Sequence, residues 1–212
     1  MTTSQSASAP KAEKPLGIAA IVAKRVSQLQ RGYLDDRAES VAALAKLRRG
    51  VGKPTGSVLD ILDYTTHEEF IREWNRDEPS KAEHAAHTAM TLYAVHQQSQ
   101  RTGMHYPEWT LGRSIRELIP KDAILKADNA IVRRFARLGT ADSYAELSHH
   151  LRGMVQLLRA ERVRLDYGRL ALDLLLWQLD DRAPQVRQRW GRDFYFPRRV
   201  AASTPDEPNT TS

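Results

Sequence analysis

The sequence contains no cysteine. This absence excludes a disulfide scaffold, cysteine-ligated zinc, an iron–sulfur cluster and a thiol nucleophile from the chain. Long apolar runs are also missing, because none approaches the roughly 18–20 residues that a membrane-spanning helix needs. The segment Met1–Pro10 is rich in serine, threonine and alanine and has no basic-then-apolar signal peptide. We therefore expect a cytoplasmic protein.

Lysine is scarce relative to arginine. Of the 32 cationic residues, 24 are arginine and only 8 are lysine, and the formal net charge is +6. A basic balance favours a polyanionic partner, and the planar guanidinium group binds phosphate through two parallel hydrogen bonds. A genome that favours arginine codons would give the same composition. Only the positions of the arginines can therefore distinguish a polyanion-binding surface from codon bias.

Strand patterns are rare, and the periodicity of the apolar residues is almost wholly helical. Between Leu147 and Leu158 the apolar side chains alternate at spacings of four and three, as in the seam of a helical bundle. From Tyr167 to Leu179 apolar residues lie on nearly every side, which predicts a buried central helix. The sequence therefore predicts an all-α protein.

The 212 residues are enough for one large domain or two small ones. A break in the helical pattern at Arg101–Pro107 divides the expected helices into two packed lobes. These are an N-terminal helical lobe at residues 15–103 and a C-terminal, four-helix-type bundle at residues 107–198. The small, polar and aperiodic ends, residues 1–14 and 199–212, predict disordered tails.

Several residues carry the signals of helix N-termini. Thr66 with Glu69, and Ser80 with Glu83, both match the capping box, in which a hydroxyl and a carboxylate satisfy free amide groups of the first turn. Asp128 is expected to cap the helix that follows it. These positions predict where three helical segments begin.

Catalytic motifs are not found. The sequence has neither a Gly-x-Ser-x-Gly elbow nor a His-Glu-x-x-His zinc motif. The loop Gly50–Ser57 differs from a Walker A phosphate-binding loop, because Pro54 follows Lys53 and because the segment follows a helix. The sequence thus predicts a protein that is not an enzyme and has no cofactor; an enzyme with an unrecognised site stays open as a third hypothesis.

Seven histidines remain as candidates for metal binding or acid–base chemistry. His84 and His87 are three residues apart, whereas two-histidine zinc sites usually place their ligands four apart beside a carboxylate. We interpret this pair as solvated. His96 falls on the alanine-rich stripe of the same helix and is interpreted as a hydrogen-bonded core residue, so no metal site is predicted.

The basic positions are better organised than the histidines. Between residues 111 and 137 there are seven cations and three acids, and Arg133 and Arg137 share one face of a helix. Such stripes fit contacts with a phosphate backbone, which position a nucleic acid without reading its sequence. A solvated helix face with scattered salt bridges gives the same pattern. The candidate nucleic-acid-binding residues are Arg48, Arg49, Lys53, Arg113, Arg116, Arg133, Arg134, Arg137, Arg152 and Arg159.

A series of short motifs follows in a characteristic order. The most distinctive are Leu165–Trp177 and Val186–Phe194. Shorter ones are Leu47-Arg48-Arg49-Gly50, Thr110-Leu111-Gly112-Arg113, Arg133-Arg134-Phe135 and His150-Leu151-Arg152. In this order and spacing, from about residue 18 to residue 196, the chain resembles the CasB family, the small subunit of the type I-E CRISPR Cascade effector complex.

The resemblance implies a non-catalytic, all-helical subunit that acts in antiviral defence. Two copies would pack head to tail along the complex, in contact with its backbone subunits and its large subunit. The expected task is to stabilise the R-loop, through contacts with the guide RNA and the target DNA and especially with the displaced strand. The resemblance implies no membrane partner.

Two alternatives stay open beside this interpretation. Part of the ten cations would contact acidic surfaces of neighbouring subunits instead of nucleic acid. The leading competitor from another class is a helical protein–protein adaptor that does not bind nucleic acid directly.

Overall fold

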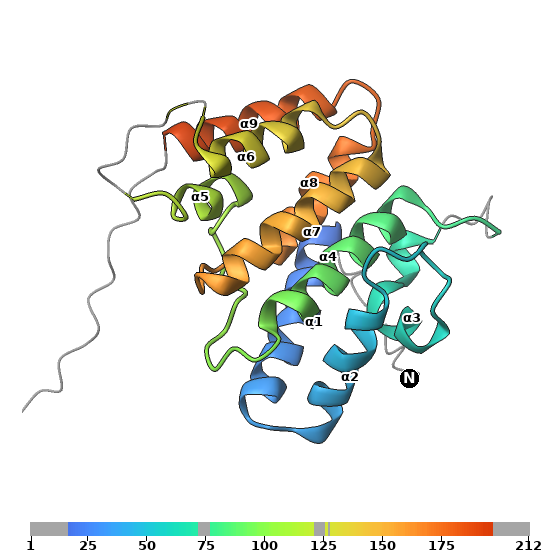
Figure 1. Ribbon diagram of the computed structural model, residues 1–212. Helices are drawn as coiled ribbons and strands as arrows, with labels where there is room; N and C mark the ends of the chain where they lie inside the picture. The colour runs from blue at the N-terminus through green and yellow to red at the C-terminus, as the bar shows by residue number, and fades with distance from the viewer. Residues whose placement is uncertain (1–16, 72–76, 121–125, 127, 197–212) are drawn as a thin grey trace, which may run out of the picture.

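The computed structural model describes residues 17–71, 77–120, 126 and 128–196, and Figure 1 shows that they form an assembly of packed helices. The α-helices are α1 (Gly17–Leu34), α2 (Ala38–Arg49), α3 (Leu62–Thr65), α4 (Lys81–Gln97), α5 (Leu111–Arg116), α6 (Ala130–Thr140), α7 (Tyr144–Ala160), α8 (Tyr167–Trp177) and α9 (Ala183–Tyr195). Two short 3-10 helices, η1 (Leu59–Ile61) and η2 (Glu68–Phe70), precede and follow α3. Within the described residues no strand forms, apart from one isolated bridge between His105 and Leu165. The prediction of an all-α protein is confirmed, and both predicted tails lie outside the described residues.

Helix α8 lies at the centre of the fold, where it packs against α1 and α4. Its side chains Tyr167 and Leu170 are buried, as expected for a helix with few polar residues. Gly168 allows the close crossing with α1, because a Cβ atom at this position would lie 2.6 Å from the carbonyl oxygen of Ala19. The predicted buried helix is confirmed, and it ends at Trp177.

Helix α4 lies between α2 on one side and α7 and α8 on the other. Its small side chains Ala85, Ala86 and Ala89 are fully buried, which lets neighbouring helices approach closely. The predicted capping box begins the helix: the Glu83 amide donates to Ser80 Oγ (3.1 Å), and the Ser80 amide donates to Glu83 Oε2 (2.8 Å). This prediction is therefore confirmed.

Buried polar contacts join α4 and α8 to the turn after α4. His96 Nδ1 lies 2.9 Å from the hydroxyl of Tyr167, and the Tyr167 amide donates to His105 Nδ1 at 3.2 Å. Gln30 of α1 then binds both backbone groups of His105, accepting from its amide at 2.8 Å and donating to its carbonyl at 3.2 Å. Burial lowers the pKa of His96 to about 4. The interpretation of His96 as a hydrogen-bonded core residue is confirmed.

Helices from both predicted lobes share one hydrophobic core. Helices α1 and α4 pack against α8, and α4 also packs against α7, so the buried apolar residues form a continuous cluster. The intervening turn is held to the second half of the chain, because the Leu165 amide donates to the carbonyl of Met104 at 2.9 Å. The division into lobes at 15–103 and 107–198 stays a prediction.

Two of the predicted caps are wrong by one residue. The Glu69 amide donates to the His67 ring at 3.2 Å, so His67 rather than Thr66 caps the short helix η2. At α6 the N-cap is Asn129 rather than Asp128, and its side-chain oxygen accepts from two amide groups of the first turn. In both places the neighbouring side chain can also accept a hydrogen bond, and sequence spacing does not separate such neighbours.

Candidate nucleic-acid interface

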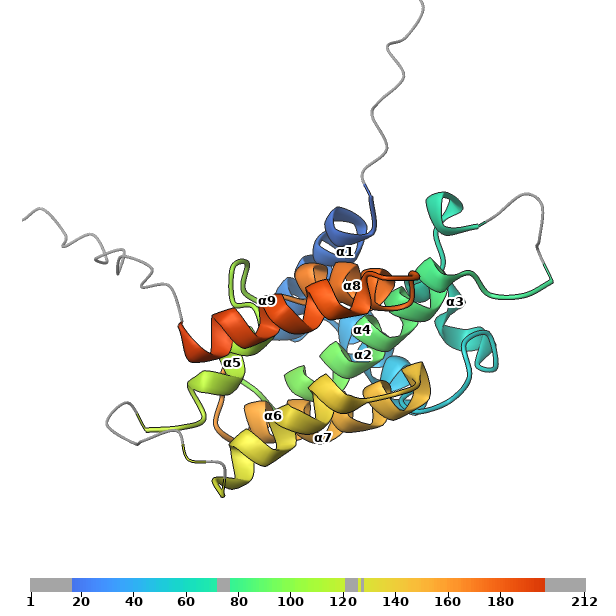
Figure 2. The ribbon, with the colours of Figure 1, turned by 90° about the horizontal axis from the view of Figure 1, so that it is seen from above.

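Helices α6 and α7 form an outer layer on one side of the molecule. Figure 2 shows this layer along the lower edge of the view, with α9, α8 and α1 above it in the picture. The two helices are consecutive in the chain and pack against each other. Five of the ten predicted cations lie on these two helices.

Helix α6 presents a free cationic face. Its apolar side holds it to the molecule, since Val132 and Leu138 are buried and the rings of Phe135 and Phe194 of α9 stack with centroids 4.3 Å apart. The opposite face is exposed and carries Arg133, Arg134 and Arg137. Helix α6 contains no acidic residue, and no described carboxylate pairs with these three arginines.

Helix α7 carries one free and one engaged arginine. The predicted seam is confirmed, because its residues Leu147, Leu151, Met154 and Leu158 are buried. Arg152 is exposed on the opposite side. Arg159 instead donates from Nε to the carbonyl oxygen of Gln98 (3.0 Å) and from Nη1 to its Oε1 (3.3 Å). Its guanidinium group thus ties α7 to the turn after α4.

A cleft of about 700 Å³ opens between the 51–55 loop, α4 and the first half of α7. Lys53 and Arg152, which are far apart in the sequence, both line it; we call it the Lys53–Arg152 cleft. Other polar side chains that line it are Thr55, His84, His87, Thr88, Thr91, Tyr144, Ser148 and His149. No lining residue is acidic, so the charge of the cleft favours an anion.

Two histidines of α4 hold the loop that carries Lys53. His84 Nδ1 lies 2.9 Å from Thr55 Oγ1, and His87 Nε2 lies 3.2 Å from the carbonyl oxygen of Gly50. The interpretation of these histidines as solvated is wrong for His87, whose exposed fraction is 4% and whose pKa is lowered by burial. Its spacing from His84 gave no sign of this contact, because the loop partner lies far away in the sequence.

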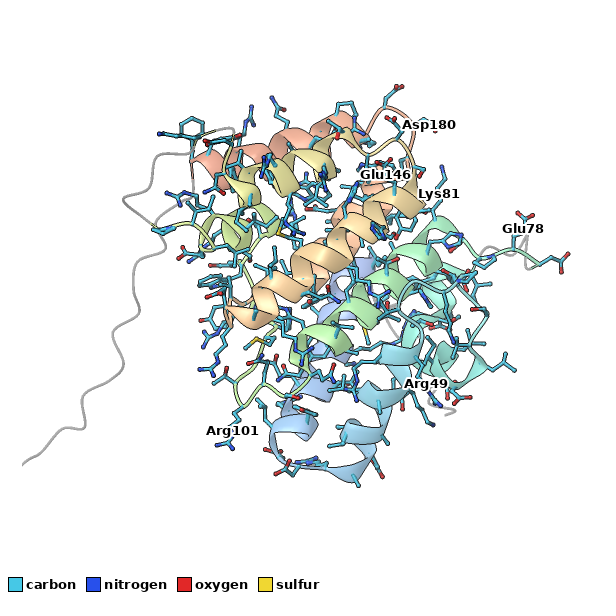
Figure 3. The ribbon with its side chains drawn as sticks, viewed as in Figure 1. Arg49, Glu78, Lys81, Arg101, Glu146 and Asp180 are labelled. Carbon is cyan, nitrogen blue, oxygen red and sulfur yellow. The ribbon has the colours of Figure 1, made fainter. Side chains whose placement is uncertain are left out.

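The cations at the end of α2 are separate from the α6–α7 layer. Arg49 pairs with Asp60 at 2.8 Å, and both side chains are more than half exposed. Figure 3 shows Arg49 at the lower right of the molecule, far from α6 along its upper edge. Arg48 is half-buried and has no carboxylate partner among the described residues.

A second cleft, of about 1020 Å³, lies between α5, α8 and α9. Arg113 lines it, with its guanidinium carbon 4.3 Å from the centre of the Trp109 ring, in the range of a cation–π contact. The second predicted cation of α5, Arg116, donates to the carbonyl oxygen of Ile119 at 2.9 Å. Sequence reasoning did not select three further arginines of this cleft, which are Arg169, Arg189 and Arg192.

Two of those arginines are bound to a buried carboxylate. Asp173 is 1% exposed, and it pairs with Arg189 and with Arg169, the latter at 3.2 Å. It also accepts from Trp190 Nε1 at 2.6 Å. Burial raises the pKa of Asp173, and the two guanidinium groups oppose this effect. The spacing of four between Arg169 and Asp173 was the one signal in the sequence for this cluster.

The structure thus brings together only part of the ten predicted cations. Lys53 and Arg152 share a cleft, the three arginines of α6 share a face, and Arg113 lines the second cleft. Those engaged within the chain are Arg49, Arg116 and Arg159. One of the ten, Arg49, pairs with a described carboxylate, which leaves most of the predicted set unneutralised.

Neither a metal cluster nor a membrane helix emerges from the described residues. They include no group of three or more histidine, aspartate or glutamate side chains that could hold a metal ion. None of the described helices has the length and apolar character that crossing a bilayer requires.

A comparison with protein families gives one match. The model of the CRISPR-associated protein Cse2 family matches residues 43–195, which is more than half of the chain. A comparison with curated proteins gives no match.

Solved structures of CasB proteins are similar to this chain. CasB from Thermobifida fusca is 39% identical with a TM-score of 0.69, and the match covers 84% of this chain and 97% of that one. CasB from Thermus thermophilus is 25% identical with a TM-score of 0.60 over the same shares. CasB from M. ruber is 27% identical with a TM-score of 0.55, covering 81% of this chain and 92% of that one. The family match and the 39% identical relative together show that this protein belongs to the CRISPR-associated Cse2 (CasB) family.

Proposed function

We propose that this protein is a non-catalytic subunit of Cascade, the CRISPR RNA-guided DNA surveillance complex of antiviral defence, and that it stabilises the R-loop. It does so through sequence-independent contacts with the backbone of the displaced non-target strand and of the guide–target duplex. In the complex it packs against the backbone and large subunits and against a second copy of itself. It acts in the cytoplasm and changes no covalent bond.

The free arginine face of α6 is the observation that carries this proposal. Three exposed guanidinium groups lie on one short helix, and no described carboxylate neutralises them, which favours an external anion as their partner. Three cations grouped on one face of a stiff helix fit a sugar–phosphate chain, which carries a negative charge on every phosphate. Lys53 and Arg152 provide two further cations in the neighbouring cleft.

Modest contacts of this kind are enough for the task. The heteroduplex formed in an R-loop is about as stable as the DNA duplex that it replaces, so small contributions from protein decide the balance. The displaced strand has no fixed sequence, and a positive surface that ignores base identity is what it requires.

The proposal is tested by reversing charge on α6. Cascade assembled with the variant Arg133→Glu/Arg137→Glu is expected to bind target DNA about tenfold more weakly, which corresponds to about 1.4 kcal/mol. Assembly itself, measured by size-exclusion chromatography, is expected to be unchanged, because the proposal assigns both exposed side chains to nucleic acid and not to a neighbouring subunit. Unchanged target binding by this variant would contradict the proposal.

A matched control makes the same change of charge elsewhere. Arg31 and Arg101 are exposed and have no described carboxylate partner, and Figure 3 shows Arg101 at the lower left of the molecule, away from α6. The variant Arg31→Glu/Arg101→Glu is expected to bind target DNA within about twofold of the wild type. A decrease equal to that of the α6 variant would mean that net charge, rather than position, governs binding.

The adaptor hypothesis is favoured by a different feature, the exposed aromatic end of α9. Tyr195 is 49% exposed and Phe196 is 80% exposed, and aromatic side chains are enriched where proteins meet. A gel shift of the full chain with a single-stranded oligonucleotide at two salt concentrations separates the hypotheses. Absence of binding at low salt would support the adaptor, whereas binding that weakens with added salt supports the R-loop role.

A further inference from the structure

His87 lines the Lys53–Arg152 cleft, and its buried Nδ1 atom has no hydrogen-bond partner among the described residues. His87 Nε2 faces the carbonyl oxygen of Gly50 at 3.2 Å, so a neutral ring carries its proton on Nε2 and leaves Nδ1 as an acceptor. The hydroxyl of Ser148, which also lines the cleft, hydrogen-bonds with the Tyr144 hydroxyl. Buried polar groups are nearly always paired in folded proteins, and an unpaired one favours a ligand that supplies the partner.

The rest of the cleft has an apolar part and a cationic rim. Leu92 and Pro54 line it beside the ring of Tyr144, and this ring is fixed because its hydroxyl donates to the carbonyl of His84 (3.1 Å) and contacts Thr88 Oγ1 (3.0 Å). Both rim cations, described above, are exposed. The cleft therefore offers an aromatic ring, a buried acceptor and two outer cations within one space of about 700 Å³.

We propose that the Lys53–Arg152 cleft binds one nucleotide of a single-stranded nucleic acid, with its base inside and its phosphates at the rim. The base contacts His87 and the Tyr144 ring, while Lys53 and Arg152 bind the phosphates. This inference rests on the proposed function and adds that one base of the bound strand is held out of the stack. A phosphate alone would bind the rim cations and leave the buried His87 Nδ1 atom unpaired.

The cleft is expected to accept any of the common bases. Each base has at least one N–H group on its pairing edge, either an amino or an imino group, and each can donate to His87 Nδ1. Each also has a flat face that can lie against an aromatic ring, and this kind of contact tolerates sequence. The cleft volume lies within the range of about 300–1,000 Å³ that is typical of small-molecule sites.

The test fills the cleft without removing charge. Ala145 is an exposed residue of α7 that lines the cleft, so Ala145→Phe is expected to obstruct entry of a base. Ala160 is exposed at the other end of the same helix and does not line the cleft, so Ala160→Phe is the matched control. The readout is the affinity of the full chain for oligothymidylate of about twelve nucleotides and for an abasic strand of equal length and charge.

The wild type and Ala160→Phe are expected to bind oligothymidylate at least about fivefold more tightly than the abasic strand, because one base contact is lost in the latter. In Ala145→Phe the preference is expected to fall below about twofold, with binding of the abasic strand unchanged. Circular dichroism of the three proteins verifies that their helical content is equal.

The possible failures are distinguishable. If Ala145→Phe keeps the full preference of the wild type, the nucleotide cleft is wrong. If the wild type binds both strands equally and Arg133→Glu/Arg137→Glu weakens both, the R-loop role stands and the cleft is again wrong. If the wild type binds neither strand at low salt, direct contact with a single strand is refuted, and the cleft proposal falls with it.

Discussion

At the residue scale, three buried histidines are held in their neutral form. Burial lowers the pKa of His87, His96 and His105, and for His96 the value falls from 6.5 to about 4. Between these two values the unfolded chain binds a proton on the ring and the folded chain does not. The free energy of unfolding therefore decreases as the pH falls through this window and is fully restored above about 6.5.

This linkage gives a prediction for His96. From about pH 7 to about pH 4.5 the wild type is expected to lose about 2 kcal/mol of unfolding free energy through this residue alone. His96→Gln is expected to lose less over the same interval, since its side chain does not titrate. Urea denaturation at both pH values measures the difference, and His149→Gln, at an exposed position, is the control. Equal pH dependence in His96→Gln and the wild type would refute the assignment.

The buried carboxylate of Asp173 gives a second prediction at this scale. Asp173→Ala removes the partner of Arg169, Arg189 and Trp190 at once, and breaking a buried pair in this way costs about 3–5 kcal/mol. Asp180→Ala, at an exposed site, is expected to stay within about 0.5 kcal/mol of the wild type. Denaturant unfolding measures both, and a loss below about 1 kcal/mol in Asp173→Ala would show that the cluster is not structural.

At the scale of elements, the crossing of α1 and α8 depends on a missing side chain. A Cβ atom at Gly168 would meet the carbonyl oxygen of Ala19 at 2.6 Å and the Cβ of Ala23 at 2.8 Å. At Gly153, within α7, nothing lies within 4 Å of the corresponding position. The same change from glycine to alanine should therefore act in opposite directions at these two helical sites.

We predict that Gly168→Ala lowers the free energy of unfolding by about 1–3 kcal/mol, because the helices have to move apart. Gly153→Ala is expected to raise it by about 0.5–1 kcal/mol, since alanine restricts the unfolded chain and favours the helix. Thermal and urea denaturation of both variants measure these changes. A neutral or stabilising Gly168→Ala would mean that the close helix crossing is incorrect.

The sequence was most informative about features that lie within a single helix. The apolar repeat between Leu147 and Leu158 and the capping box at Ser80 depend on neighbours within one helix, so local spacing predicted them. The caps His67 and Asn129 were missed by one residue, because adjacent side chains compete for the same amide groups. The outward face of α6 was predictable for the same local reason as the α7 seam.

Contacts between distant segments could not be predicted in this way. The meeting of Lys53 with Arg152 depends on how the 51–55 loop packs beside α4 and α7. Likewise, Arg159 is engaged by the carbonyl of Gln98, and a backbone acceptor leaves no mark in the sequence. The charge pattern therefore located exposed cations on α6 and α7 but did not separate free cations from engaged ones.

At the scale of the whole molecule, a net charge of +6 is spread over several surfaces. Only free cations release counterions when nucleic acid binds, so the salt dependence of binding counts them. For a single strand, each neutralised phosphate contributes about −0.7 to the slope of log affinity against log salt concentration. The slope is thus a measure of how many of the ten candidates take part.

Removal of the α6 cations is expected to change the slope of log affinity against log salt concentration. Replacing Arg133, Arg134 and Arg137 with glutamine is expected to reduce the magnitude of the slope by about 2 for a single-stranded oligonucleotide. Fluorescence anisotropy of the full chain over a salt series measures it. An unchanged slope would exclude α6 from the interface.

A matched triple variant removes the same number of positive charges at positions outside α6. Arg31, Arg101 and Arg162 are exposed and lack a described carboxylate partner. Their replacement with glutamine is expected to leave the slope within about 0.5 of the wild-type value. A reduction similar to that of the α6 variant would indicate diffuse binding over the whole surface.

The anchoring of the 51–55 loop by His84 and His87 has a kinetic consequence. Because Thr55 and Gly50 are already held to α4, Lys53 is presented in position before any strand arrives. Capture of a passing strand then requires no rearrangement of the loop, and little backbone entropy is lost at that step. Encounter should therefore proceed at a rate set by diffusion and electrostatic attraction.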